Sequence, residues 1–186
     1  MRRLITLSRA EMLERWKLMR RMEPLRSDCS VTRTDGIDLD RELTMEMQAW
    51  YVRALLEESA DHLPLTELSG EVSVTRAPCG AGMVSLPDNC LRVVSVTLRG
   101  WQVPARVVAD PQSAVALAQL SPWARAGCAS PVAVVHSTHV MLYTPPEGEI
   151  VLESMLAVTY CEDDTIYRLT PYLLSMITPP DMSEIC

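Results

Sequence analysis

Two histidines are the residues whose type and spacing come closest to a metal site. His136 and His139 flank Ser137-Thr138. On a strand, positions three apart point to opposite faces, so this spacing favours a turn at a strand end over two converging ligands. The chain holds only 3 histidines in all, which leaves few further nitrogen ligands. We therefore expect no bound metal.

A cysteine stands beside three acidic residues in the segment Cys161-Glu162-Asp163-Asp164. Neighbouring carboxylates raise the pKa of a thiol, which is the reverse of what a nucleophile needs. The Asp-Asp pair also lacks the spacing and the central glycine of an EF-hand calcium loop. The segment is typical of an exposed acidic loop that follows a strand.

The remaining motifs give no support to nucleotide binding or hydrolysis. Gly80-Ala81-Gly82 lacks the third glycine of a dinucleotide-binding turn, and no Gly-Lys-Ser/Thr sequence occurs. No serine has the Gly-x-Ser-x-Gly setting of a hydrolase elbow. We expect no catalytic residues and no cofactor. An enzyme that acts through Cys161 or His136 is the least favoured alternative.

Charge and composition narrow the class of protein. The chain has 186 residues, 48% of them hydrophobic, and a net charge of −7, with a pI of about 5.0. This size suits one domain, or one domain with an appended helical element. The acidic charge disfavours a conventional nucleic-acid binder, whose affinity comes from Lys and Arg. The 6 cysteines form no C-x-x-C pair and no signal peptide precedes them, so we expect reduced thiols in a soluble protein.

Two helices are expected before residue 64. Ser8 and Glu11 have the spacing of a capping box, which predicts a first helix over 8–22, and Pro24 ends it. A second helix over 39–60 is predicted by one long apolar stripe. The stripe consists of Leu39, Leu43, Met47, Trp50 and Ala54.

Alternating apolar and polar residues predict strands after Pro64. The expected strands cover 71–77, 91–98, 102–108, 131–136, 139–143 and 150–160, with a turn at 79–82 and short helices at 113–120 and 169–177. Grouped strands indicate an α+β fold: N-terminal helices, one of them long and amphipathic, then a mostly antiparallel sheet or sandwich with a short inserted helix. We expect a helical region over 1–64, a β-rich domain over 65–168 and a C-terminal segment over 169–186 that packs back on the helices.

The four tryptophans and one arginine are the candidate interface residues. Trp16 and Trp50 lie in helical apolar stripes, which favours core or helix–helix packing. Trp101 and Trp123 follow turns, where an aromatic side chain either covers a core or anchors an interface. Arg125 joins them, because arginine suits ion pairs at interfaces.

The segment 84–108 is a Pro-Asp turn that feeds an alternating strand, after which Gly100 turns the chain back, so by itself it predicts a hairpin. Within it, Leu86-Pro87-Asp88-Asn89-Cys90-Leu91-Arg92 followed by 93–96 resembles the "LPxDfLRlvsv" segment of phage head–tail adaptor proteins. Cys90 stands where that family usually has an aromatic residue. Further segments resemble the family in the same order: Gly100-Trp101 with Pro104, the loop 120–127, and 131–134 ahead of Leu142-Tyr143-Thr144-Pro145-Pro146.

The resemblance covers about residues 35–177 and is to the tail-tubular-protein-A type of short-tailed and crAss-like phages. It implies a ring of about twelve identical subunits between portal and tail, which is a closed head-to-tail assembly. The implied partners are other copies of the chain, the portal protein and a tail or nozzle protein. Genomic DNA would pass through the ring without sequence-specific binding, and no membrane would be involved. The implied location is the head–tail junction of the virion, after synthesis in the host bacterial cytoplasm.

Two alternatives stay open beside the adaptor. Another phage tail component, such as a tail terminator, a minor tail protein or a baseplate protein, fits the same residues. A small non-viral module that binds a ligand or peptide on its sheet also fits, and it would be a monomer with a concave apolar site.

Overall fold

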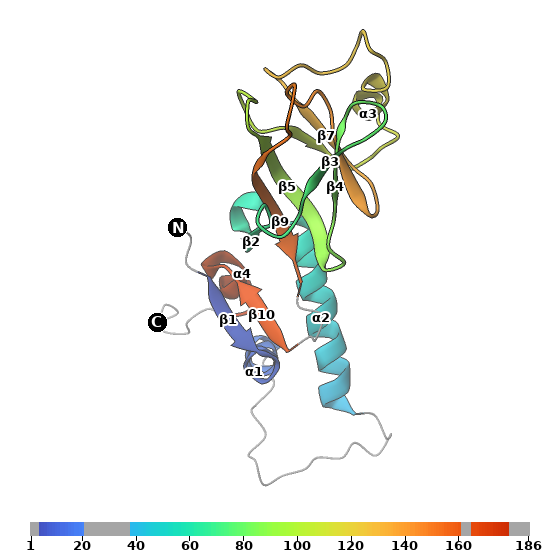
Figure 1. The fold of residues 1–186 in the computed structure, drawn as a ribbon. Helices are drawn as coiled ribbons and strands as arrows, with labels where there is room; N and C mark the ends of the chain where they lie inside the picture. Colours follow the sequence, from blue (N-terminus) through green and yellow to red (C-terminus); the bar gives the residue numbers. More distant parts are fainter. Residues whose placement is uncertain (1–3, 21–37, 161–164, 179–186) are drawn as a thin grey trace, which may run out of the picture. The chain divides into compact units, whose positions relative to one another are not determined.

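The computed structural model describes residues 4–20, 38–160 and 165–178 (Figure 1). It has helices together with sheets whose strand pairs are mostly antiparallel, so the predicted α+β fold is confirmed. The chain divides into two compact units, one of residues 1–64 with 161–186 and one of residues 65–160. We call them the helical unit and the β unit.

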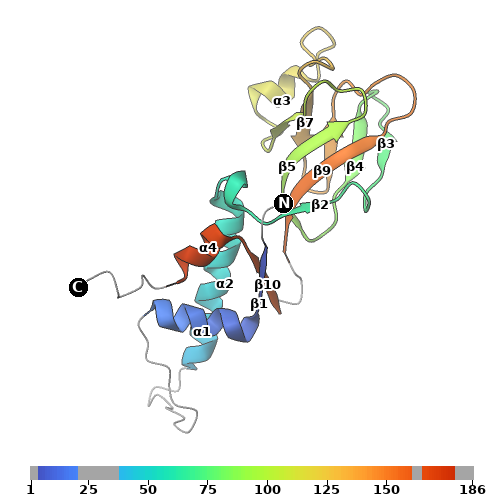
Figure 2. The same cartoon turned by 90° about the vertical axis from the view of Figure 1, so that its left-hand side faces the viewer.

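The described residues of the helical unit form three α-helices, one short 3-10 helix and a two-stranded sheet. Its elements are β1 (Ile5–Ser8), α1 (Arg9–Met19), α2 (Leu39–Glu57), the short 3-10 helix η1 (Ala60–His62), β10 (Ile166–Leu169) and α4 (Pro171–Met176). Strands β1 and β10 pair in antiparallel register, with Ile5 opposite Leu169, and lie side by side in both ribbon views (Figures 1 and 2).

The predicted capping box begins α1. The Ser8 N–H donates to the Glu11 carboxylate at 2.8 Å, and the Glu11 N–H donates to the Ser8 hydroxyl oxygen at 3.3 Å. These bonds satisfy two backbone N–H groups that a helix start leaves open. The Ser8 N–H and the Ser8 hydroxyl, which both donate to the Glu11 carboxylate, hold the pKa of that carboxyl below its ordinary value. The helix ends at Met19, three residues before the predicted end.

A buried tyrosine joins α2 to the strand pair. The Tyr51 hydroxyl donates to the Arg168 carbonyl at 2.9 Å and accepts from the Arg168 N–H at 3.1 Å. Its ring packs edge-on against Tyr167, with centroids 5.0 Å apart. A second link comes from the Thr170 hydroxyl, which donates to the His62 carbonyl at 2.6 Å. The C-terminal strand and helix are therefore tied to α2 and η1.

The β unit is built from two sheets. Its elements are β2 (Leu65–Glu67), β3 (Val74–Arg76), β4 (Gly82–Ser85), β5 (Cys90–Leu98), β6 (Arg106–Val108), α3 (Ala114–Ala118), β7 (Val132–Val135), β8 (His139–Leu142) and β9 (Leu152–Thr159). One sheet has the order β2-β9-β5 and the other β3-β4-β8-β7-β6. Only the β6–β7 pair is parallel.

The two sheets of the β unit share one core. Fully buried side chains from both sheets, among them Val84, Val96, Leu142 and Met155, belong to a single hydrophobic cluster. Such a core, filled from the inner faces of two sheets, is the arrangement of a β-sandwich. The sequence-based sheet or sandwich is thus present.

The hairpin predicted over 84–108 is wrong. Strand β5 pairs with β9, whereas β6 pairs with β7, so the two segments lie in different sheets. Gly100 does turn the chain, with φ at +94°, and a Cβ there would lie 3.0 Å from Pro146 Cγ. Beyond the turn the Ala105 N–H still donates to the Val96 carbonyl at 2.8 Å, but β6 then joins the other sheet, and Trp101 is buried in the shared core.

Two further expectations differ from the structure. The predicted turn at 79–82 already contains the start of β4, since Gly82 pairs with Leu142 of β8 and a Cβ there would lie 3.2–3.3 Å from neighbouring side-chain atoms. The β unit ends at Tyr160 instead of residue 168. The reason is that β10 finds its partner in β1, at the other end of the sequence.

One arginine ties two loops of the β unit together. The Arg76 guanidinium donates to the Gly80, Pro146 and Gly148 carbonyls at 3.2, 3.2 and 2.9 Å. A single side chain with several donors in a planar fork suits this task. It holds the loop after β3 against the loop after β8.

Candidate functional site

Three of the four predicted interface tryptophans contribute to packing. Trp16 is 3% exposed and its ring lies 5.5 Å from that of the half-buried Trp50, which joins α1 to α2. Trp101 is 8% exposed, and its indole N–H donates to the Thr144 carbonyl at 3.0 Å. Between the two alternatives left open for Trp101, the structure supports the core.

Trp123 is the opposite case, because its side chain is 98% exposed. Two further apolar side chains of the same short segment are also exposed, Leu117 at 47% and Leu120 at 67%. We call these three residues the Trp123 patch. A large aromatic side chain left fully in water is unfavourable unless something else covers it. The patch is therefore a candidate interaction surface.

A buried glutamine holds the loop that carries Trp123. Gln119 is 3% exposed, its amide nitrogen donates to the Val115 carbonyl at 3.0 Å, and its amide oxygen accepts from the Ala126 N–H at 2.8 Å. The Arg125 Nε donates to the Gln119 carbonyl at 3.0 Å. These bonds close residues 119–126 into a fixed loop.

The same loop is fastened to the strands beneath it. The Arg125 guanidinium lies 5.8 Å from the ring centre of Tyr143, within reach of a cation–π contact. The Thr144 hydroxyl donates to the Ala126 carbonyl. Thr144 has a φ of +55°, a left-handed conformation that costs energy for a branched residue. Its contacts with Ala126 and Trp101 hold it there.

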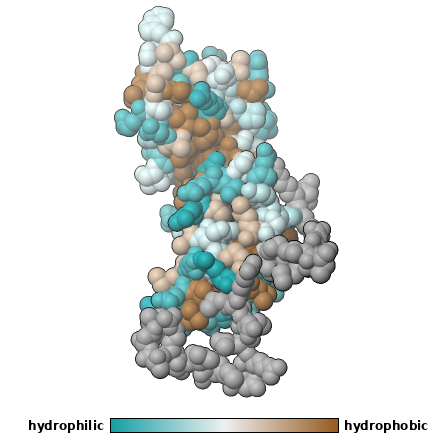
Figure 3. Space-filling view, turned by 180° about the vertical axis from the view of Figure 1, so that it is seen from behind, coloured by the Kyte–Doolittle hydropathy of each residue, from teal (hydrophilic) through white to brown (hydrophobic). Residues whose placement is uncertain are grey.

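A second exposed apolar surface lies on α2. Met45, Val52 and Leu56 are 61%, 41% and 47% exposed, and Ala49 is exposed between them. Their spacing of four, three and four residues places them along one side of the helix. We call this set the α2 stripe. The buried residues of the helix, such as Met47 and Ala54, lie on the opposite side. Figure 3 shows apolar side chains among hydrophilic ones at the surface.

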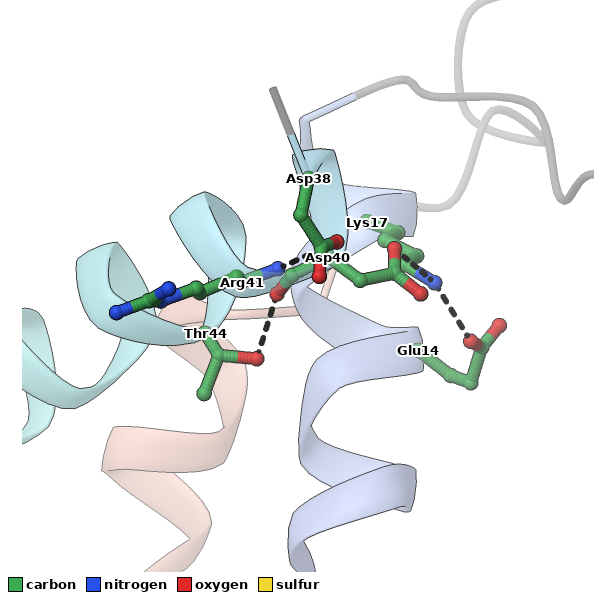
Figure 4. A network of polar contacts seen from close by, with 6 residues as sticks. All are labelled: Glu14, Lys17, Asp38, Asp40, Arg41 and Thr44. Carbon is green, nitrogen blue, oxygen red and sulfur yellow. Dashed lines mark hydrogen bonds and ion pairs between the residues drawn. The ribbon is translucent and has the colours of Figure 1, made fainter. Parts of the chain in front are cut away.

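Charge differs between these two surfaces. The α2 segment 38–57 has five acidic residues and two arginines, whereas residues 111–146 contain Arg125 and no acidic residue. Lys17 of α1 forms one ion pair with Asp40 in the first turn of α2, at 3.0 Å, and one with Glu14 of its own helix, at 3.3 Å (Figure 4). Burial works against the charge of Lys17, but hydrogen bonds to both carboxylates outweigh it and raise its pKa. The helix segment that carries the α2 stripe is thus more acidic than the segment that carries the Trp123 patch.

The histidine pair lies at a hairpin turn, as the sequence predicted. The His136 N–H donates to the His139 carbonyl at 2.8 Å, and the two rings stack with centroids 4.7 Å apart. Burial and the neighbouring His139 lower the pKa of His136. Among the described residues, no three His, Cys, Asp or Glu side chains are grouped so that they could hold a metal ion. The predicted acidic loop at 161–164 lies outside the described residues.

Sequence reasoning named Trp123 and Arg125 among its candidates, but it named neither Gln119 nor the α2 stripe. A signal for the stripe is present in the sequence, since Met45, Ala49 and Val52 repeat at helical spacing beside the main apolar stripe. No such signal exists for Gln119, because its partners depend on how the loop folds back.

No protein-family model matches this chain, and no curated protein matches it. Within the part of the chain that the structure describes, no helix is both long and apolar enough to cross a membrane. The resemblance to phage adaptors therefore stays a prediction that rests on the residues quoted for it.

Proposed function

We propose that this chain is a non-enzymatic structural protein of a phage particle, a head–tail adaptor that forms a ring of identical subunits between portal and tail. DNA passes through the ring without sequence-specific binding. In this proposal α2 is the long amphipathic helix and provides contacts to neighbouring subunits or to the portal. The loops of the β unit provide the other contacts.

The observation that carries the proposal is the fully exposed Trp123 on a loop that is already fixed. Interface hot spots are enriched in tryptophan, and a loop that is ordered before binding loses little entropy when it binds. A site for catalysis would instead gather polar reactive groups in a concave pocket. A role in assembly therefore explains the exposed Trp123 side chain better than a role in catalysis does.

The arrangement of the resembling segments adds support. Gly100-Trp101, the loop 120–127 and the segment 142–146 are far apart in sequence, yet they are in contact in the structure. Trp101 donates to the Thr144 carbonyl, and the Thr144 hydroxyl donates to Ala126. Segments that were noted for their order thus build one local structure, which is what a shared motif would do.

Charge is compatible with passage of DNA. A net charge of −7 on each copy would give a ring that repels phosphate groups, so that DNA slides without sticking. The location in the proposal is the head–tail junction of the virion.

Native mass spectrometry and negative-stain electron microscopy test the proposal, each with the protein alone and with the portal protein of the same phage. We expect a ring of identical copies that binds the portal. A chain that stays monomeric and binds neither portal nor tail would contradict the proposal. A chain found in assembled particles only at the distal tail would instead identify another tail component.

A further inference from the structure

The Trp123 patch and the α2 stripe are two of the exposed apolar surfaces of the described residues; they belong to different units and differ in form and in charge. We propose that the Trp123 patch of one copy docks onto the α2 stripe of the next copy, and this inference rests on the assembly proposed above. The occupant of each surface is thus a second copy of the same chain.

Closed rings explain why two different surfaces are needed. In a head-to-tail ring each subunit uses one surface toward one neighbour and a different, complementary surface toward the other. Among the exposed apolar side chains of the described residues, those around Trp123 include the most exposed one, and those of the α2 stripe lie along one side of the longest helix. An aromatic side chain that projects from a loop can pack against the side of a helix.

Side-chain size also fits. Ala49 is the smallest residue of the α2 stripe and lies between Met45 and Val52. A small residue between larger ones leaves a low point on a helix surface, into which a bulky side chain of a partner inserts. Met45 is unbranched and adapts its shape to an aromatic neighbour. Trp123 would occupy this low point.

Charge decides between this pairing and a pairing of two α2 stripes. Two α2 helices would bring ten acidic residues and four arginines together, since each carries five and two. Of the acidic residues, Glu46 is already paired with Arg20 and Asp40 with Lys17, but Glu42 and Glu57 are exposed on the helix. Like charges placed together oppose association. The segment that carries Trp123 has no acidic residue and brings Arg125 instead.

Two substitutions, each at an exposed position, disrupt the two surfaces one at a time. Trp123→Ser removes the aromatic ring from a side chain that is 98% exposed. Ala49→Glu places a charged side chain in the middle of the α2 stripe, at an exposed helix position where glutamate is well tolerated. As matched controls, Val103→Ser removes another exposed apolar side chain of the β unit, and Ala10→Glu adds the same charge on α1.

The test is native mass spectrometry of the single variants and of their mixture, with the portal present if the wild-type chain assembles only there. Each interface variant should raise the dissociation constant of the contact between subunits on the order of 30-fold or more, as expected when a hot-spot residue is lost. Both controls should assemble like the wild type. Mixed in equal amounts, the two variants should form a heterodimer and nothing larger, because only one competent contact remains between them.

The outcomes separate the two proposals. If the wild type forms rings and both variants form them equally well, the docking pair is wrong while the adaptor proposal stands. If both variants are defective but their mixture gives no heterodimer, the two surfaces do not contact each other and the inference is again wrong. A wild-type chain that never self-associates, with or without portal, contradicts both proposals.

Discussion

Replacing Gln119 by leucine tests whether a fixed loop presents Trp123. The change keeps the size of the side chain but removes both of its amide hydrogen bonds, to the Val115 carbonyl and from the Ala126 N–H. Each neutral hydrogen bond contributes about 1 kcal/mol. We expect the loop to lose about 2 kcal/mol of local stability, which corresponds to a factor of about 30 in its opening equilibrium.

Amide hydrogen exchange over residues 119–126 measures that loss directly. In Gln119→Leu these amides should exchange about 30-fold faster, and assembly should weaken by up to the same factor because the loop must be ordered again on binding. Gln112→Leu is the matched control, since Gln112 is exposed and its side chain has no described hydrogen bond. Faster exchange with unchanged assembly would refute the role of the fixed loop in binding. Unchanged amide exchange would show that the Gln119 hydrogen bonds do not hold the loop.

Three further predictions concern the fold that supports these surfaces. Tyr51→Phe should destabilise the helical unit by about 1–3 kcal/mol in urea unfolding, because both backbone groups of Arg168 lose their partner; an unchanged midpoint would contradict this. Since the pKa of His136 is lowered from 6.5 in the folded state, the unfolded chain takes up its proton first, and the wild type should lose stability as the pH falls below that value. His136→Gln should show a flatter pH dependence between pH 7 and 5, and an identical slope would count against the shift. Arg76→Met should cost the β unit about 1 kcal/mol, with Arg76→Lys costing less, because three loop carbonyls lose a shared donor at an exposed site; equal stability of both variants would contradict the tie.

Local signals explain which parts of the fold the sequence predicted. The capping box at Ser8 and the apolar periodicity of 39–60 involve residues within a few turns of one another, and both lead to helices in the structure. Strands with a full alternation, such as β5 and β9, were also predicted within a few residues. Such short-range patterns predict the structure well because burial of the apolar face of a helix or strand stabilises that element directly.

Long-range pairing explains what the sequence could not show. Strands β1 and β10 have four residues each and become strands only because they pair with each other across the whole chain. Strands β5 and β6 are separated because they pair with β9 and β7, and the turn at Gly100 does not reveal these partners. The local sequence does not indicate which sheet the chain joins after a turn.

The candidate interface residues show the same difference between local and long-range signals. Trp101 and Trp123 both follow turns, and their local sequences do not distinguish them. Trp101 finds the Thr144 carbonyl more than forty residues later, whereas Trp123 finds no cover in the described chain. A tertiary contact therefore separates a core residue from a candidate anchor.

The most direct test of the central claim is native mass spectrometry of the wild-type protein with its portal, read beside Trp123→Ser. The account predicts a closed ring of identical chains bound to the portal, and a large loss of that ring when Trp123 is replaced. A wild-type protein that remains a single chain in the presence of the portal would contradict it.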